Sequence, residues 1–180
     1  MSFQVTPSSV AETGGILELL ALVRDDVSQP LAGAQVNFRS EVGTLASGGR
    51  FLTTDADGEA RDTLTVTAAD LQIIGDDNFE VTAEVGGAGG SIISRTFSVG
   101  IQRSPQASFS FQRAGLVVTF TDTSSGSPTS WQWDFGDGTP ISSQQNPVHA
   151  YSAAGTYVVT LSARNSIGIS TASNLVQITN

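Results

Sequence analysis

Hydrophobic and polar residues alternate along most of the chain, in short stretches separated by clusters of Gly, Asp, Asn, Ser and Pro. Val36 and Phe38 alternate with polar neighbours, and Phe79, Val81 and Ala83 repeat the same period of two. A period of two places every second side chain on one face of a β-strand. The pattern therefore predicts an all-β protein built from antiparallel β-sandwiches.

In the first half, strands are expected over residues 16–24, 34–39, 50–54, 59–67, 79–85 and 92–99. The sequence Asp55-Ala56-Asp57-Gly58 is typical of a tight turn, so we expect strands 50–54 and 59–67 to pair as a hairpin. Residues 68–74 form the one helix candidate, but a segment this short is not predicted to be stable by itself.

The second half shows the same alternation with a different composition. Trp131, Trp133 and Phe135 alternate into a turn, and Tyr157 and Val159 begin another alternating stretch. Residues 1–102 carry 14 acidic residues and 5 arginines, net charge −9, whereas residues 103–180 carry 3 of each, net charge 0. This difference supports two domains, residues 1–102 and residues 103–180.

Composition excludes several classes of function. The net charge of −9 and the absence of Lys do not fit a nucleic-acid binder. Because Cys is absent, there are no disulfides, no thiolate metal sites and no Cys nucleophile. No apolar run reaches the length of a membrane span. The N-terminus lacks the features of a signal peptide, so an export signal is expected to have been removed or to lie outside this chain.

Residues 103–180 contain three motifs, in order along the chain. The first is Trp133-Asp134-Phe135-Gly136-Asp137-Gly138, the second is Asn146-Pro147-Val148-His149-Ala150-Tyr151, and the third begins at Gly155 and includes Tyr157. With these motifs and their spacing, this half resembles a PKD (polycystic kidney disease) domain. The resemblance implies an Ig-like β-sandwich.

Residues 1–102 contain turn and strand segments at 23–26, 30–38, 43–45 and 53–60. With these segments, this half is similar to the bacterial Ig-like domain of the invasin and intimin type. Segment 69–78 departs from the short loop that is usual in that family. Together the two resemblances imply tandem Ig-like antiparallel sandwiches in an exported bacterial protein, extracellular or at the cell surface, with neighbouring domains in a longer parent chain. Fold analogy does not supply a ligand.

The motif residues of the second half have structural interpretations. Alternation places Trp131, Trp133 and Phe135 on one face, where large rings favour a core, and Gly136 to Gly138 then allow the chain to turn. An exposed Trp131 would instead offer a platform for a sugar. His149 is the one histidine of the chain, so any His-based catalysis depends on it, and the PKD resemblance assigns it to packing. Tyr157 resembles a tyrosine corner.

Clustered carboxylates in loops are candidate ligands for calcium, which binds six to eight oxygens. In the first half these candidates are Asp25, Asp26, Asp55, Asp57, Asp76 and Asp77. The segment at Asp55 is not an EF-hand, because Gly58 comes too early and no Glu closes a loop of the required length. Turns account for the same Asp residues without a metal.

The sequence therefore favours a non-enzymatic surface or secreted module, acting as a stalk, a spacer or an adhesion and protein-interaction pair, with no cofactor apart from possible calcium. One alternative is a carbohydrate- or matrix-binding accessory region of a secreted hydrolase, and another is a subunit of a surface filament whose free sheet edges pair with neighbours. The expected partners are protein or polysaccharide surfaces.

Overall fold

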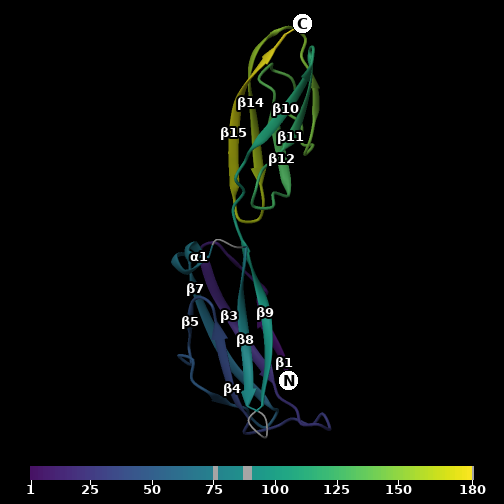
Figure 1. Cartoon of the computed structure of the whole chain (residues 1–180). Helices are drawn as coiled ribbons and strands as arrows, with labels where there is room; N and C mark the ends of the chain where they lie inside the picture. Colours follow the sequence, from purple (N-terminus) through teal and green to yellow (C-terminus); the bar gives the residue numbers. More distant parts are fainter. Residues whose placement is uncertain (75–76, 87–90, 180) are drawn as a thin grey trace. The chain divides into compact units, whose positions relative to one another are not determined.

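The computed structural model describes residues 1–74, 77–86 and 91–179, and it divides the chain into two compact units, Met1–Gln102 and Arg103–Asn180 (Figure 1). We call these unit 1 and unit 2. Nearly all regular structure is β-strand, which confirms the predicted all-β fold class. No helix in the described part of the chain is long and apolar enough to cross a membrane.

Unit 1 begins with three strands, β1 (Ser2–Thr6), β2 (Ser9–Ala11) and β3 (Gly14–Leu22). The elements that follow are β4 (Gln35–Ser40), β5 (Thr44–Leu45), β6 (Leu52–Thr53), β7 (Glu59–Thr67), α1 (Ala68–Ile73), β8 (Asn78–Gly86) and β9 (Ile92–Gln102). Their order in the sheet is β5-β7-β3-β2-β9-β8-β4-β6, with β1 paired to β3. The short β2 joins two groups of strands, because it pairs with β3 on one side and runs parallel to β9 on the other.

The core of unit 1 follows the alternation along each strand. Leu17 and Leu19 of β3 are buried and share one apolar cluster with Val36 and Phe38 of β4, whereas Glu18 is exposed. β3 and β7 are joined along nine residue pairs, from Gly14↔Thr67 to Leu22↔Glu59. This long antiparallel register fixes which side chains of both strands point outward.

The hairpin expected between strands 50–54 and 59–67 is wrong, although the turn between them forms. The Asp55 side chain accepts hydrogen bonds from the backbone N–H groups of Asp57 and Glu59. β6 pairs with β4, however, and β7 pairs with β3 and β5. The turn sequence specifies that the chain reverses but not which strands then pair. The nine-residue β7 gains far more hydrogen bonds from β3 than the two-residue β6 could supply.

The helix candidate at 68–74 forms as α1, Ala68–Ile73. Thr67 caps it: the Thr67 hydroxyl accepts from the Asp70 backbone N–H, and the Asp70 carboxylate accepts from the Thr67 N–H. This capping box and the burial of Leu71 in the unit 1 core stabilise a segment too short to be helical by itself.

Unit 2 is built from two three-stranded antiparallel sheets. One contains β10 (Phe109–Ala114), β11 (Val117–Asp122) and β13 (Val148–Ala150), in that order, and the other contains β12 (Ser130–Asp134), β14 (Gly155–Arg164) and β15 (Ile169–Ile178). Val118 and Phe120 from the first sheet and Trp133, Val159 and Leu161 from the second are fully buried in one core. The core therefore lies between the two sheets.

Candidate functional site

Several aromatic and ionisable side chains of unit 2 lie close to β12 and to the turn that follows it. Trp133 is fully buried, and its ring lies 5.1 Å from Phe109 and 5.4 Å from Phe120, centroid to centroid. The Trp133 Nε1–H donates to the backbone oxygen of Gln144 at 2.9 Å. No part of this indole is available to a ligand at the surface.

Asp137 and His149 form a pair beside this aromatic core. The Asp137 Oδ2 and His149 Nε2 atoms are 2.8 Å apart, and both side chains are mostly buried. The His149 ring stacks on Phe135 at 3.9 Å with an interplanar angle of 4°. The Thr139 hydroxyl donates to Asp137 and not to His149, so the Thr, Asp and His are not in the order that activates a hydroxyl nucleophile.

The pKa of Asp137 is lowered. Burial alone would raise it, but hydrogen bonds from Thr139 and His149 to the carboxylate outweigh this effect. Tyr151 lies next to the pair, and burial, reinforced by the charge of Asp137, raises the pKa of its phenol to about 12. The Tyr151 hydroxyl donates to the Phe135 backbone oxygen at 3.1 Å. Both groups therefore hold their protonation states across the neutral range.

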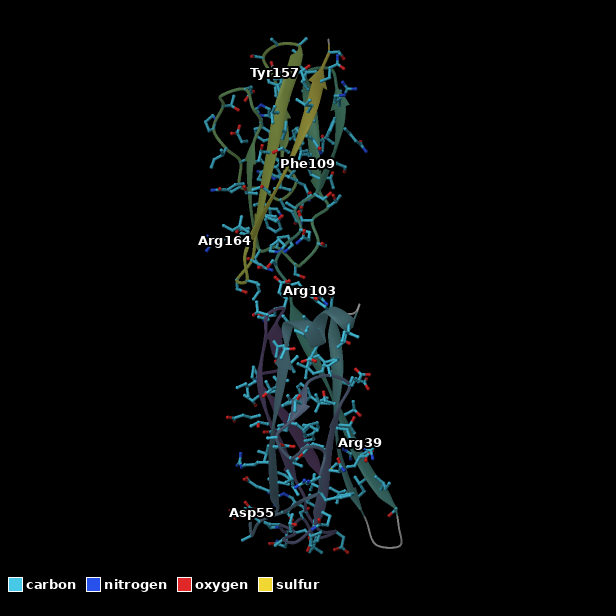
Figure 2. The ribbon with its side chains drawn as sticks, turned by 90° about the vertical axis from the view of Figure 1, so that its left-hand side faces the viewer. Arg39, Asp55, Arg103, Phe109, Tyr157 and Arg164 are labelled. Atoms are coloured by element: carbon cyan, nitrogen blue, oxygen red, sulfur yellow. The ribbon has the colours of Figure 1, made fainter. Side chains whose placement is uncertain are left out.

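Tyr157 is the third residue of β14, and its hydroxyl donates to the backbone oxygen of Ala153, four residues upstream, at 3.0 Å. Its ring stacks on Tyr151 at 4.3 Å. Figure 2 shows Tyr157 near one end of unit 2 and Arg164 near the other, at the two ends of β14. The geometry is that of a tyrosine corner, in which the hydroxyl ties a strand to the preceding loop.

Asp122 is a hydrogen-bonding centre that the sequence reasoning missed. Its carboxylate accepts from the Ser124 N–H and hydroxyl, from the Trp131 Nε1–H at 2.7 Å and from the Gln145 side chain at 3.1 Å. Burial would raise the pKa of Asp122, but these hydrogen bonds lower it. The bond to Ser124 has a local signal, Asp-x-Ser after a strand, whereas those to Trp131 and Gln145 depend on the tertiary fold and have none.

The calcium candidates of unit 1 lie mostly in turns. The Asp25 side chain accepts from the N–H groups of Val27 and Gln29, as Asp55 does in its own turn. Figure 2 shows Asp55 among the loops at one end of unit 1. Asp76 falls outside the described residues. Within residues 1–74, 77–86 and 91–179, no group of three or more His, Asp or Glu side chains could hold a metal ion.

Each unit also has a hollow on the outer face of a sheet. In unit 1 a hollow of about 500 Å³ lies over β1, β3 and β7 and is lined by polar side chains that include Glu18 and Arg61. In unit 2 a hollow of about 380 Å³ lies over β12 and β14 and includes Gln132 and Arg164. Trp131 also lines this second hollow, but it is half-buried and its indole N–H is bonded to Asp122.

Comparison with known proteins identifies unit 2. Residues 103–180 match the family model of the PKD domain. The PKD1 domain of the Vibrio cholerae metalloprotease PrtV is 32% identical, and the match covers 43% of this chain and 99% of that domain, with a TM-score of 0.40. Through its C-terminal unit, the chain belongs to the PKD domain family.

Two further solved structures resemble nearly the whole chain. Mouse nectin-like molecule 4 is 18% identical with a TM-score of 0.61, covering 99% of this chain and 63% of that ectodomain. Yersinia pseudotuberculosis InvD is 16% identical with a TM-score of 0.58, covering 97% of this chain and 56% of that structure. These matches show the fold, two tandem Ig-like domains, and confirm the resemblance to invasin- and intimin-type domains that the sequence indicated.

Proposed function

We propose that this chain is a non-enzymatic pair of Ig-like modules within a longer exported bacterial protein, where it acts as a stalk, a spacer or an adhesion and protein-interaction region. Similarity to a domain of a metalloprotease and to InvD supports membership in such a multidomain protein. The proposal concerns this chain only, since a catalytic domain elsewhere in the parent protein is compatible with it.

One observation carries the proposal: His149, the one histidine of the chain, is already engaged on two sides. Asp137 bonds its Nε2 atom and Phe135 covers its ring. A general base must reach the proton of a nucleophile or a substrate. A histidine fixed between Asp137 and Phe135 serves packing instead, and its hydrogen bond ties the turn after β12 to β13.

The test is a screen of the full chain against glycosidase, esterase and peptidase substrates, with His149→Ala and His149→Gln as variants. We expect no turnover by the wild type, while the thermal unfolding of unit 2 shifts downward in both variants because the bond to Asp137 is weakened or lost. Turnover that disappears in His149→Gln while unit 2 remains folded by tryptophan fluorescence would contradict the proposal.

A further inference from the structure

The hollow on unit 1 lies on the outer face of the strands β1, β3 and β7, which pair in that order in the sheet. Its volume of about 500 Å³ is within the range of small-molecule sites, roughly 300 to 1,000 Å³. The side chains that matter for its chemistry are Gln4, Thr6, Glu18, Leu20, Arg61 and Thr63.

The strand register brings these side chains together in two rows. Thr6 pairs with Glu18, which pairs with Thr63 across β3 and β7. The second row lies two residues further along the strands, where Leu20 pairs with Gln4 on one side and with Arg61 on the other. Residues two apart on a strand point to the same face, so both rows project away from the core.

The composition of the rows fits a polyhydroxyl ligand. Leu20 is half-buried and supplies an apolar surface at the middle of its row, where the C–H face of a sugar ring can pack. Around it stand a carboxylate, a primary amide, a guanidinium and two hydroxyls. These groups offer both donors and acceptors, which matches sugar hydroxyls, since each hydroxyl both donates and accepts.

One wall of the hollow is fixed before any ligand arrives. Asp62 is more than nine-tenths buried, and its carboxylate accepts hydrogen bonds from the Ser47 N–H and hydroxyl and from the Thr63 N–H. These bonds hold the segment at Ser47 against β7, beside the Thr63 row. A site held by rigid neighbours loses less conformational entropy on binding.

We propose that this hollow is a binding site for a neutral oligosaccharide. Both signs of charge are present, because Glu18 and Arg61 lie in adjacent rows, and the Arg61 guanidinium, which donates one hydrogen bond to Glu59, has further N–H groups to offer a ligand. Unit 1 carries all of the net charge of −9, so an anionic polysaccharide would be repelled. The residues that line the hollow include no Trp, Tyr, Phe or Met, the side chains that most often anchor a protein partner together with Arg.

This site rests on the proposed function as an interaction module and specifies the partner class. The probes are cello-, chito- and manno-oligosaccharides, titrated calorimetrically into the full chain. We expect at least one of them to bind with a Kd of about 1 mM or tighter, corresponding to roughly −4 kcal/mol or more favourable. Gln4→Ala and Glu18→Gln should each weaken that binding by about tenfold, because the first removes an amide and the second replaces a charged acceptor oxygen with a donor, and neither touches the core.

The matched control is Gln132→Ala, which removes an outward-facing Gln from the hollow of unit 2 and should leave the affinity unchanged. Loss of binding in Gln132→Ala, unchanged binding in Gln4→Ala and Glu18→Gln, or no binding of any of the three sugars would overturn the site. Chromatography of the recovered sugars separates the two proposals. Cleavage by the wild type would contradict the non-enzymatic function, whereas intact sugars that do not bind would contradict this site alone.

Discussion

Trp133 and Trp131 are two residues apart on β12, yet their surroundings differ. Trp133 is fully buried between Phe109 and Phe120, whereas Trp131 is half-buried and its indole reaches Asp122. Alternation in the sequence places both on one face. The depth of burial depends on what covers each ring, and here the cover comes from β10 and β11, which belong to the opposite sheet.

We expect Trp133→Ala to lower the free energy of unfolding of unit 2 by about 3 to 5 kcal/mol, because it leaves a large cavity in a small core. Trp131→Phe is the control: it keeps an aromatic ring and loses one hydrogen bond to a carboxylate, so about 1 to 2 kcal/mol is expected. Both tryptophans lie in unit 2, and each variant retains one of them, so urea titration by tryptophan fluorescence measures this unit alone. Equal losses in the two variants would contradict the burial argument.

Asp122 and Asp137 should make unit 2 sensitive to acid. Burial would raise the pKa of each carboxyl, but hydrogen bonds lower it below the ordinary value of about 3.9. A lowered pKa in the folded state contributes stability that is present above the unfolded-state pKa and is lost as the pH falls through the folded-state pKa. The melting temperature of unit 2 should therefore fall steeply below about pH 4.

The variants Asp122→Asn and Asp137→Asn test this dependence. Each should melt at a lower temperature than the wild type near neutral pH, and each should lose less stability on acidification. Melting curves by tryptophan fluorescence across the acid range give both quantities. An acid-induced drop of the same size in wild type and in the Asp122→Asn/Asp137→Asn double variant would show that other carboxyls are responsible.

The turn after β12 contains two glycines with left-handed backbones but different surroundings. Gly136 has a φ of 75°, and a Cβ there would lie 2.3 Å from the backbone oxygen of Val158. Gly138 has a φ of 79°, and no atom lies within 4 Å of its Cβ position. Gly136 is therefore required both by conformation and by the close approach of β14, and Gly138 by conformation alone.

We expect Gly138→Ala to destabilise unit 2 by about 1 to 2 kcal/mol, the cost of a left-handed conformation for a residue with a Cβ. Gly136→Ala should cost clearly more, because the backbone of the turn or of β14 must also move. Urea denaturation followed by tryptophan fluorescence compares the two. If Gly138→Ala proved the more damaging variant, the contact with Val158 would not limit the turn.

At the scale of elements, the sequence indicates most strands but not all of their partners. The alternation of hydrophobic and polar residues around Val36 and Phe38, or around Leu17 and Leu19, is a property of one short segment, so it can be recognised in the sequence. The partner of a strand depends on which other strand shares its length and apolar face, which explains why the turn at 55–58 was predicted correctly but the pairing of strand 50–54 with strand 59–67 was wrong. The capping box that stabilises α1 joins Thr67 and Asp70, and the prediction, which considered only the shortness of the segment, did not take it into account.

The two units of the molecule differ strongly in net charge. Unit 1 holds 14 acidic residues and 5 arginines, and unit 2 holds 3 of each. Arg39 pairs with Glu84 and Arg61 with Glu59, but 5 arginines cannot balance the charge of 14 carboxylates. Unscreened repulsion of this kind destabilises a compact state without changing its fold.

Salt should therefore stabilise the two units unequally. Raising NaCl from about 10 mM to about 150 mM shortens the screening length from roughly 30 Å to 8 Å, so the melting temperature of unit 1 should rise by several degrees while that of unit 2 changes little. Scanning calorimetry of the full chain gives both transitions, and tryptophan fluorescence assigns the one that belongs to unit 2.

CaCl₂ at equal ionic strength tests the calcium candidates, because specific binding adds stability beyond screening. We expect any such excess in unit 1, since this unit carries 14 acidic residues against 5 arginines, whereas unit 2 carries 3 of each and has a net charge of 0. Extra stabilisation by CaCl₂ that is confined to unit 2 would contradict this assignment. Equal melting curves in CaCl₂ and NaCl would show that the chain does not bind calcium specifically.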